Sequence, residues 1–264
     1  MPENTAQGSD ELQLNQPVCI HTLQITDCCL DKDCIEDLRV YLTAQSQAAL
    51  ECATSTKVRS AELLYVDVSV EALAYKSGYY AVDLTFYYRI VGETLQGAAR
   101  PTAILGLSVF TKRTVLYGGK VKAKIFRSSD EIPESADLSN LDRPEAIAEA
   151  LDPMVLSSKV KEVREGCSIE NELFDFPESI TNLYGEELVT SGESRRLYIS
   201  IGQFSTVRLE RDTQLSVTAG EYCAPTRECC DEEECEEDPC ELFSRIDFPM
   251  QAFFPEADSG CRCT

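Results

Sequence analysis

Alternating apolar and polar residues in the first half of the chain predict a series of long β-strands. In the segment 58–70, VRSAELLYVDVSV, the side chains of Val66, Val68 and Val70 share one face, because successive residues of a strand point to opposite sides. The segment 79–91, YYAVDLTFYYRIV, is rich in aromatic and β-branched residues, which favour strands. The Lys-Ser-Gly sequence just before the second segment predicts a hairpin turn between the two strands.

The strand pattern continues further along the chain. Residues 103–111 and 113–117 are predicted strands, and the Gly118-Gly119 pair predicts another hairpin turn. The segment 120–126, KVKAKIF, would follow that turn with three lysines on one side. Alternation returns in residues 195–220. Together these segments predict a mainly β fold with an antiparallel, sandwich-like core.

The segment 128–194 differs from its surroundings because it is acidic and rich in turn residues. It contains one helix candidate, where Pro144 opens the sequence EAIAEAL and Pro153 follows it. Both ends of the chain are rich in cysteine and acidic residues. The sequence therefore predicts a cysteine-rich N-terminal arm at 1–55, a β-rich core at 56–222 with an acidic excursion at about 128–194, and an acidic, cysteine-rich C-terminal tail at 223–264.

The overall charge limits the partners of this chain. Its 264 residues carry a formal net charge of −22, which repels nucleic-acid phosphates and anionic lipids, so we expect neither nucleic acid nor membrane as a partner. Every apolar run is far shorter than the about 18 residues that span a bilayer. The first residues lack the basic start and apolar stretch of a secretory signal. We therefore expect synthesis in the cytoplasm without export.

The charge is distributed unevenly along the sequence. Residues 53–127 carry a net charge of +6, whereas residues 128–194 carry −13 and residues 221–247 carry −9. Basic side chains on the predicted strands would form a positive face: Lys112, Arg113, Lys120, Lys122 and Lys124. This face has two interpretations. It attracts the acidic segments of another copy and steers self-association, or it is neutralised by the acidic excursion of the same molecule.

Thirteen cysteines are the main candidates for chemistry. They avoid the strands predicted above and gather mostly in the two arms: Cys19, Cys28, Cys29, Cys34, Cys52, Cys167, Cys223, Cys229, Cys230, Cys235, Cys240, Cys261 and Cys263. Full oxidation within one chain leaves one cysteine over, and a ring between adjacent cysteines is strained. We therefore expect disulfides between neighbouring molecules. The alternative is that both arms fold back and staple their own core.

Other chemistry has little support in the sequence. One histidine, His21, lies two residues from Cys19, which is weak grounds for a cysteine hydrolase, and no phosphate-binding loop motif occurs. We expect no enzymatic activity, no catalytic residue and no cofactor. The C-x2-C pairs typical of zinc sites are missing, although the x4 spacings permit a metal site. A cysteine-rich metal-binding protein is thus the alternative function, and an adhesive β module is a third.

Three segments together resemble a known family. The sequences CCLDKDCIEDLRVYL (28–42), KVRSAELLYVDVSVE (57–71) and GYYAVDLTFYYRIV (78–91), followed by an acidic cysteine-rich tail, resemble the cysteine-rich structural proteins of clostridial spore coats and exosporia. The likeness covers residues 19–125 best. It implies a self-assembling shell protein, made in the mother-cell cytoplasm and deposited at the spore surface.

The resemblance also implies how such a protein works. Copies of the chain would join by disulfides into a two-dimensional lattice, with other spore surface proteins as further partners. The functional positions would be the cysteines, and no catalytic residue is carried over. Oxidation after the mother cell lyses would reconcile cytosolic synthesis with thirteen cysteines, because disulfides rarely persist in the cytosol.

Overall fold

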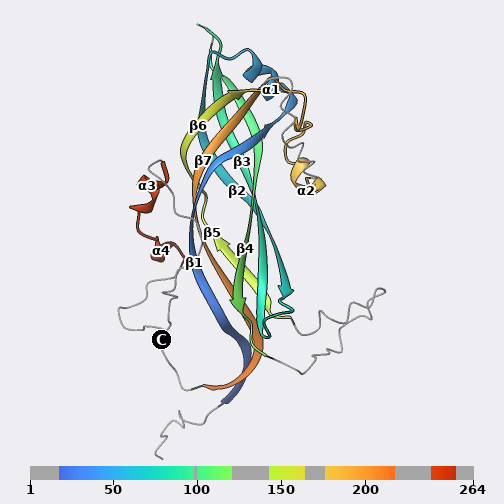
Figure 1. The fold of residues 1–264 in the computed structure, drawn as a ribbon, viewed down its shortest axis with the longest axis vertical. Helices are drawn as coiled ribbons and strands as arrows, with labels where there is room; N and C mark the ends of the chain where they lie inside the picture. The colour runs from blue at the N-terminus through green and yellow to red at the C-terminus, as the bar shows by residue number, and fades with distance from the viewer. Residues whose placement is uncertain (1–17, 98–99, 121–142, 164–175, 218–238, 254–264) are drawn as a thin grey trace, which may run out of the picture.

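The computed structural model describes residues 18–97, 100–120, 143–163, 176–217 and 239–253. The predicted mainly β, antiparallel fold is confirmed in these residues (Figure 1). The strands are β1 (Val18–Leu42), β2 (Ser55–Ala72), β3 (Tyr79–Leu95), β4 (Thr102–Tyr117), β5 (Glu145–Ala150), β6 (Met154–Glu162) and β7 (Arg195–Val217). The helices are α1 (Ala44–Glu51), α2 (Glu178–Thr181), α3 (Pro239–Ser244) and α4 (Met250–Phe253).

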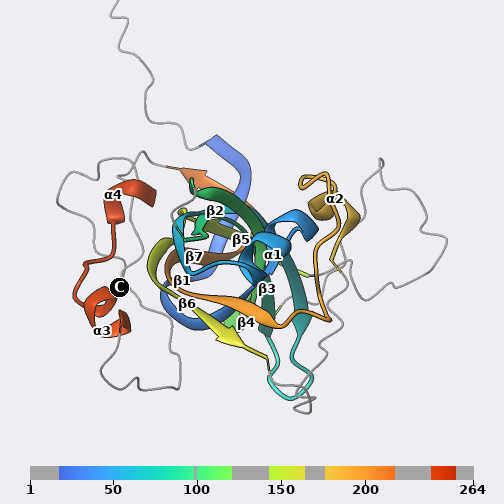
Figure 2. The same cartoon turned by 90° about the horizontal axis from the view of Figure 1, so that it is seen from above.

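The strands form two curved layers around one core. They follow the order β2-β3-β4-β1-β7-β5, with β6 also paired to β7, and all pairs are antiparallel. The strands β5 and β6 lie end to end along one edge of β7, since Ala150 pairs with Ser205 and Met154 pairs with Gly202. Seen along its length, the sheet curls into a nearly closed barrel (Figure 2). The sandwich-like core expected from the sequence corresponds to this nearly closed barrel.

The first seam of the barrel lies between β1 and β4. Among the described residues these strands are paired only at one end, where Tyr41 lies opposite Leu107 and Leu42 opposite Gly106. Beyond that point β1 continues along β7 while β4 continues along β3. Side chains and the two layers of the core, rather than a continuous backbone ladder, therefore hold this seam.

The second seam lies between β2 and the β5–β6 edge. Its bridges use side chains: Asp152 Oδ1 accepts a hydrogen bond from Leu63 N at 2.9 Å, and Arg143 Nη1 donates one to Val70 O at 3.0 Å. Asp152 lies in the short break between β5 and β6. The break thus supplies the carboxylate that satisfies a backbone N–H on the opposite strand.

The core is built from inward-facing residues at every second position. On β3 and β7 these positions are almost completely buried apolar residues: Val82, Leu84, Phe86, Tyr88, Ile90, Leu197, Ile199, Ile201, Val207 and Leu209. Burial of such side chains is the main favourable contribution to folding. Polar residues interrupt this pattern at one level, where Asp31 and Asp33 of β1 face Ser205 and Gln203 of β7 in the strand register.

The expected cysteine-rich N-terminal arm is not confirmed. Residues 18–42 form β1, the longest strand, which pairs with β7 from Val18 opposite Val217 to Val40 opposite Leu197. The sequence of β1 does not alternate cleanly between apolar and polar residues, because cysteine and aspartate occupy inward positions of this strand. The C-terminal tail is described only in part, as α3 and α4.

The expected helix between Pro144 and Pro153 is wrong. Residues Glu145–Ala150 form β5, and its alanines at positions 146, 148 and 150 pack against the core. Pairing with β7 therefore overrides the local helix signal. The other predicted strands are confirmed, with 103–111 and 113–117 joined in the single strand β4. Of the predicted strand 120–126, residues 121–126 lie outside the described residues.

The close approach of β1 and β4 at Gly106 generates a prediction. A Cβ atom at this position would lie 2.6 Å from Val40 Cγ1 and 2.9 Å from Tyr41 O, and the second atom is backbone. We expect Gly106→Ala to lower the free energy of unfolding by about 1–3 kcal/mol, the usual cost of overpacking. The control is Ala103→Val on the same strand, where the side chain is exposed and the expected change is within about 0.5 kcal/mol. Urea denaturation of both variants measures the difference, and equal midpoints would contradict it.

Candidate functional site

The structure separates the predicted cross-linking cysteines into distinct environments. Four of them lie on β1: Cys19 is exposed, Cys28 is half-buried, Cys29 is buried in the core and Cys34 faces α3. Cys52 follows α1, and Cys240 lies in α3. The others lie outside the described residues: Cys167, Cys223, Cys229, Cys230, Cys235, Cys261 and Cys263.

One disulfide joins the two ends of the described chain. Cys34 of β1 is bonded to Cys240 of α3, with Cα atoms 5.4 Å apart and 206 residues between them in sequence. Cys29 is also disulfide-bonded. The alternative in which cysteines staple their own core therefore holds for the Cys34–Cys240 pair.

Side-chain packing supports the same attachment of α3. Phe243 is buried against Gly202 of β7, where an added Cβ would lie only 2.5 Å from the Phe243 ring. Lys32 Nζ donates hydrogen bonds to the carbonyl oxygens of Ser244 at 2.8 Å and Ile246 at 2.6 Å. The helix thus lies against the outer face of β1 and β7, as Figure 1 shows. The disulfide, the aromatic contact and the lysine hold it there together.

Among the described residues, two exposed cysteines carry free thiols, and they lie at opposite ends of the described fold. Cys19 is the second residue of β1, at the end where β1 and β7 run past the core, whereas Cys52 follows α1 at the other end (Figure 1). The 25 residues of β1 alone span up to about 80 Å at roughly 3.3 Å per residue. The described fold is therefore elongated, with a free thiol at each end.

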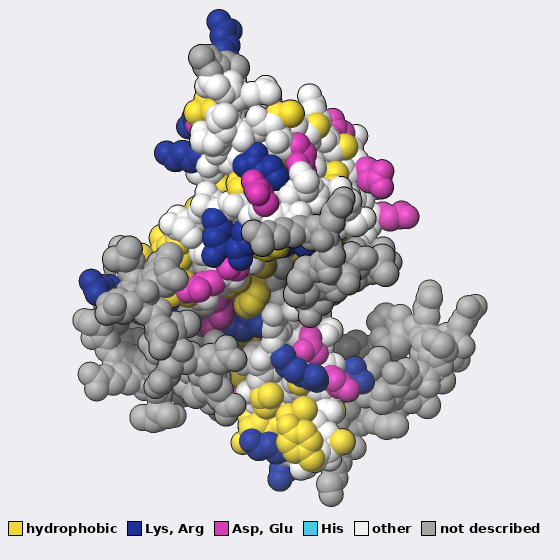
Figure 3. Space-filling view, turned by 45° about the horizontal axis from the view of Figure 1, so that its top comes forward, with side chains coloured by type: hydrophobic (Ala, Val, Ile, Leu, Met, Phe, Trp, Pro, Cys, Tyr) yellow, Lys and Arg dark blue, Asp and Glu magenta, His cyan; other side chains and the backbone are white. Residues whose placement is uncertain are grey.

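The end that carries Cys19 also exposes apolar side chains. The ribbon of β1 and β7 has both faces open there, so Ile20 and Leu215 are exposed on one face and Leu23 and Ile25 on the other. Tyr75, Val115 and Tyr117 are exposed as well. Hydrophobic side chains gather at the lower end of the molecule in Figure 3. Such clusters are typical of interaction sites.

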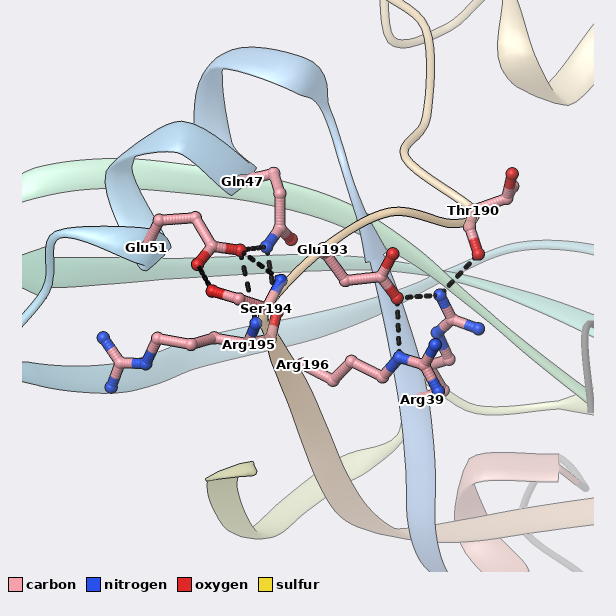
Figure 4. Close-up of polar contacts among 8 residues, drawn as sticks. All are labelled: Arg39, Gln47, Glu51, Thr190, Glu193, Ser194, Arg195 and Arg196. Carbon is pink, nitrogen blue, oxygen red and sulfur yellow. Dashed lines mark hydrogen bonds and ion pairs between the residues drawn. The ribbon is translucent and has the colours of Figure 1, made fainter. Parts of the chain in front are cut away.

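The opposite end is closed by α1 and a polar cluster (Figure 4). Glu51 Oε1 accepts hydrogen bonds from Gln47 Nε2 at 2.7 Å, from Ser194 N at 3.1 Å and from Arg195 N at 3.3 Å. Arg195 Nη1 in turn donates to Leu50 O at 2.8 Å and to Ala53 O at 2.6 Å, which ties the end of α1 to β7. Burial opposes ionisation of Glu51, but these hydrogen bonds outweigh it and lower its pKa.

A second carboxylate in the same cluster fixes the chain just before β7. Glu193 Oε1 lies 2.5 Å from Arg39 Nη2 and 2.6 Å from Arg196 Nε (Figure 4). Arg39 Nη2 also donates to Thr190 O at 2.7 Å. Burial opposes the charged form of Arg196, yet the hydrogen bond to Glu193 raises its pKa. These contacts tie the segment just before β7 to β1 and to α1.

The expected basic face is wrong where the structure describes it. Lys112 points into the core, and Arg113 Nη2 is paired with Glu71 Oε2 at 2.8 Å. Lys120 is exposed, while Lys122 and Lys124 lie outside the described residues. The charge of Arg113 is therefore neutralised within the molecule, but by Glu71 and Asp83 of the neighbouring strands and not by the acidic excursion.

Sequence reasoning missed a buried polar cluster around Lys112. Lys112 Nζ lies 3.0 Å from both carboxylate oxygens of Asp33 and also contacts Asp31 Oδ2. All three side chains are less than a tenth exposed. The available signal was the pair of aspartates at alternate positions between Cys29 and Ile35. It indicates two inward-facing carboxylates once 18–42 is known to be a strand.

The remaining predictions concern metals, catalysis and membranes. The part of the chain that the structure describes holds no group of three or more His, Cys, Asp or Glu side chains placed to bind a metal ion. His21 is exposed, with Nε2 3.7 Å from Asp212 Oδ1. Within the same ranges, no helix has the length and apolar character needed to cross a membrane. No family model, curated protein or solved structure matches this chain.

The Cys34–Cys240 bridge generates a prediction about the C-terminal segment. We expect Cys240→Ser to loosen α3, because the remaining contacts of Phe243 and Lys32 must then hold it without a covalent link. Limited proteolysis should release the segment after α3 several-fold faster than in the parent chain. Cys52→Ser is the control, since it also removes one sulfur but breaks no bridge. Equal cleavage rates in the two variants would contradict the prediction.

The lowered pKa of Glu51 predicts a pH-dependent contribution to stability. Its ordinary pKa is 4.5, so the stabilisation is fully present above that pH and is lost as the pH falls through the lower folded value. We expect Glu51→Gln to cost about 1–2 kcal/mol at pH 7, and the gap should shrink steadily below pH 4.5. Urea denaturation across this range measures it.

The control is Glu62→Gln, because Glu62 forms an exposed ion pair with Arg89. Exposed pairs contribute little, about 0–1 kcal/mol. A gap for Glu51→Gln that is independent of pH would argue against the hydrogen-bonded carboxylate as its cause.

Proposed function

We propose that this chain is a structural protein whose copies assemble into a disulfide-cross-linked layer. The observation that carries the proposal is the pair of free, exposed thiols, Cys19 and Cys52, at opposite ends of one elongated sheet. Following the resemblance to clostridial coat and exosporium proteins, we place the layer at the spore surface, with synthesis in the mother-cell cytoplasm. We propose neither catalysis nor a cofactor.

The two end thiols suit linkage between molecules better than linkage within one. They lie at opposite ends of a rigid sheet, so one molecule cannot bring them within the about 7 Å between Cα atoms that a disulfide allows. A bond from Cys19 of one copy to Cys52 of the next is heterologous, and such contacts generate rings or open filaments. Each bond removes two hydrogen atoms from two thiols and transfers them to an oxidant such as oxygen or a small-molecule disulfide.

The apolar end surface supports an assembly step that comes before any covalent bond. Ile20, Leu23 and Ile25 surround the Cys19 end and are each more than 40% exposed. Removing such surface from water favours association, at roughly 25 cal/mol per Å² of apolar area. Contact between copies would then hold the thiols close to each other while they oxidise. The alternative of a metal-binding protein gains no support from the described residues, which contain no suitable cluster.

This proposal predicts a defined pattern of covalent oligomers. Under oxidising conditions the full chain should give a ladder of high-mass species on non-reducing gels, which reductant collapses to the monomer. Cys19→Ser and Cys52→Ser should each shorten the ladder to dimers through the remaining thiol, and the double variant should lose it. Electron microscopy of the oxidised parent protein should show filaments, rings or sheets.

Cys34→Ser is the matched control, because Cys34 is already used in the internal bridge. Its monomer should be less stable, but Cys19 and Cys52 should still give a ladder. A parent chain that stays monomeric when oxidised would refute the proposal. A ladder that is unchanged in the double variant would move the cross-links to cysteines other than Cys19 and Cys52.

A further inference from the structure

The buried cluster around Lys112 has the components of a self-forming covalent bond. Lys112 of β4 contacts Asp31 Oδ2 of β1, and its Nζ lies 3.0 Å from both oxygens of Asp33. The side chains of Lys112, Asp31 and Asp33 are only 8%, 2% and 9% exposed. One amine therefore lies between two carboxyl groups, shielded from bulk water.

The surroundings of the cluster disfavour its charged forms. On β4, Lys112 lies opposite Leu84 of β3, which is fully buried, and Phe110 precedes it on the same face. Phe86 and Phe110 pack against each other with ring centroids 6.0 Å apart. Desolvation in such an environment favours a neutral amine and a neutral carboxylic acid over the corresponding ions. These neutral forms are the ones that react to give an amide.

We propose that Lys112 and Asp31 form an intramolecular isopeptide bond, with Asp33 as the proton-transfer group. The neutral Lys112 amine attacks the carboxyl carbon of Asp31 and forms a C–N bond. Asp33, in contact with Nζ, accepts a proton from the nitrogen and returns it to the departing hydroxyl group. One C–O bond breaks and one water molecule leaves. The step needs no oxidant, reductant or further reactant.

Unpartnered polar groups lie where the developing carbonyl oxygen would need a donor. Ser205 lies directly opposite Asp31 in the β1–β7 register, so both side chains point to the same face. Its hydroxyl is fully buried and has no hydrogen-bond partner in the described structure. Ser205 is thus placed to donate to the oxyanion that forms at the Asp31 carboxyl group.

A second unpartnered donor belongs to Tyr88. Its buried hydroxyl also lacks a partner among the described residues. Burial and the nearby charge of Asp33 raise the pKa of Tyr88, which keeps the hydroxyl protonated. Tyr88 is therefore a positioning residue that can hold the Asp33 carboxyl group during proton transfer.

The location of the bond matches a mechanical weakness of the fold. β1 and β4 pair through the backbone only near Tyr41 and Leu42, and the seam between them has no continuous ladder beyond that point. Asp31 and Lys112 lie on the two sides of this open stretch. An amide bond there would tie the two layers of the barrel together permanently.

Mass spectrometry of the purified, fully reduced chain tests this inference. The intact mass should be lower than the sequence mass by one water molecule. Proteolysis should give one branched peptide that contains both Asp31 and Lys112. A full sequence mass in the folded parent protein, with Lys112 open to an amine-reactive reagent after unfolding, would overturn the inference.

Three variants separate the bond from a simple ion pair. Lys112→Arg keeps the cation but removes the nucleophile, so its mass should show no loss; a loss that persists in this variant would also overturn the inference. Asp31→Asn should still react but release ammonia in place of water, so its bonded product should have the same mass as the bonded parent protein. Asp33→Ala keeps both bonding partners, and most molecules of this variant should lack the bond. Circular dichroism checks that each variant folds, and complete bonding in Asp33→Ala would remove the role assigned to Asp33.

Discussion

The antiparallel pairing of β1 with β7 organises both layers of the barrel. These strands have 25 and 23 residues and are paired from one end of the molecule to the other. β7 also carries β5 and β6 on its second edge, and β1 joins the layer of β2, β3 and β4 through its last residues. An early strand and a late strand of the chain therefore lie side by side in one layer, together with β5 and β6. Because the pairing is long-range, this layer forms only when the whole chain is present.

The shape of the barrel depends on the two seams that lie outside the β1–β7 pair. Ladders of backbone hydrogen bonds hold each layer, but the seams between layers are bridged mainly by side chains. Asp152 and Arg143, which are polar and lie at the surface, bridge the seam between β2 and the β5–β6 edge. At the other, Lys112 and two aspartates are buried in the core. A buried ionic cluster with unequal charges is costly, so a role beyond stability, such as covalent closure, accounts for its presence better than an ion pair alone.

The cysteines divide into groups that the structure distinguishes by their surroundings. Cys34 and Cys240 hold α3 on the outer face of the sheet, whereas Cys19 and Cys52 keep free thiols at its ends. Internal bridging and external cross-linking are therefore compatible in one chain, rather than competing interpretations of the same residues. The same holds for charge. The charge of Arg113 is neutralised by Glu71. The net negative charge of the rest of the chain limits which surfaces of two copies can approach each other.

Local patterns in the sequence determined the strands that alternate cleanly, such as those at 58–70 and 79–91, because neighbouring residues in such strands face core and solvent in turn. They could not determine β1, whose inward positions include aspartate and cysteine, or β5, whose alanines suit a helix equally well. Both elements depend on pairing with β7, which outweighs their local preference. The tertiary structure also decided that Cys34 meets Cys240 and that Lys112 meets Asp31. Such contacts join residues far apart in sequence, and spacing along the chain carries no record of them.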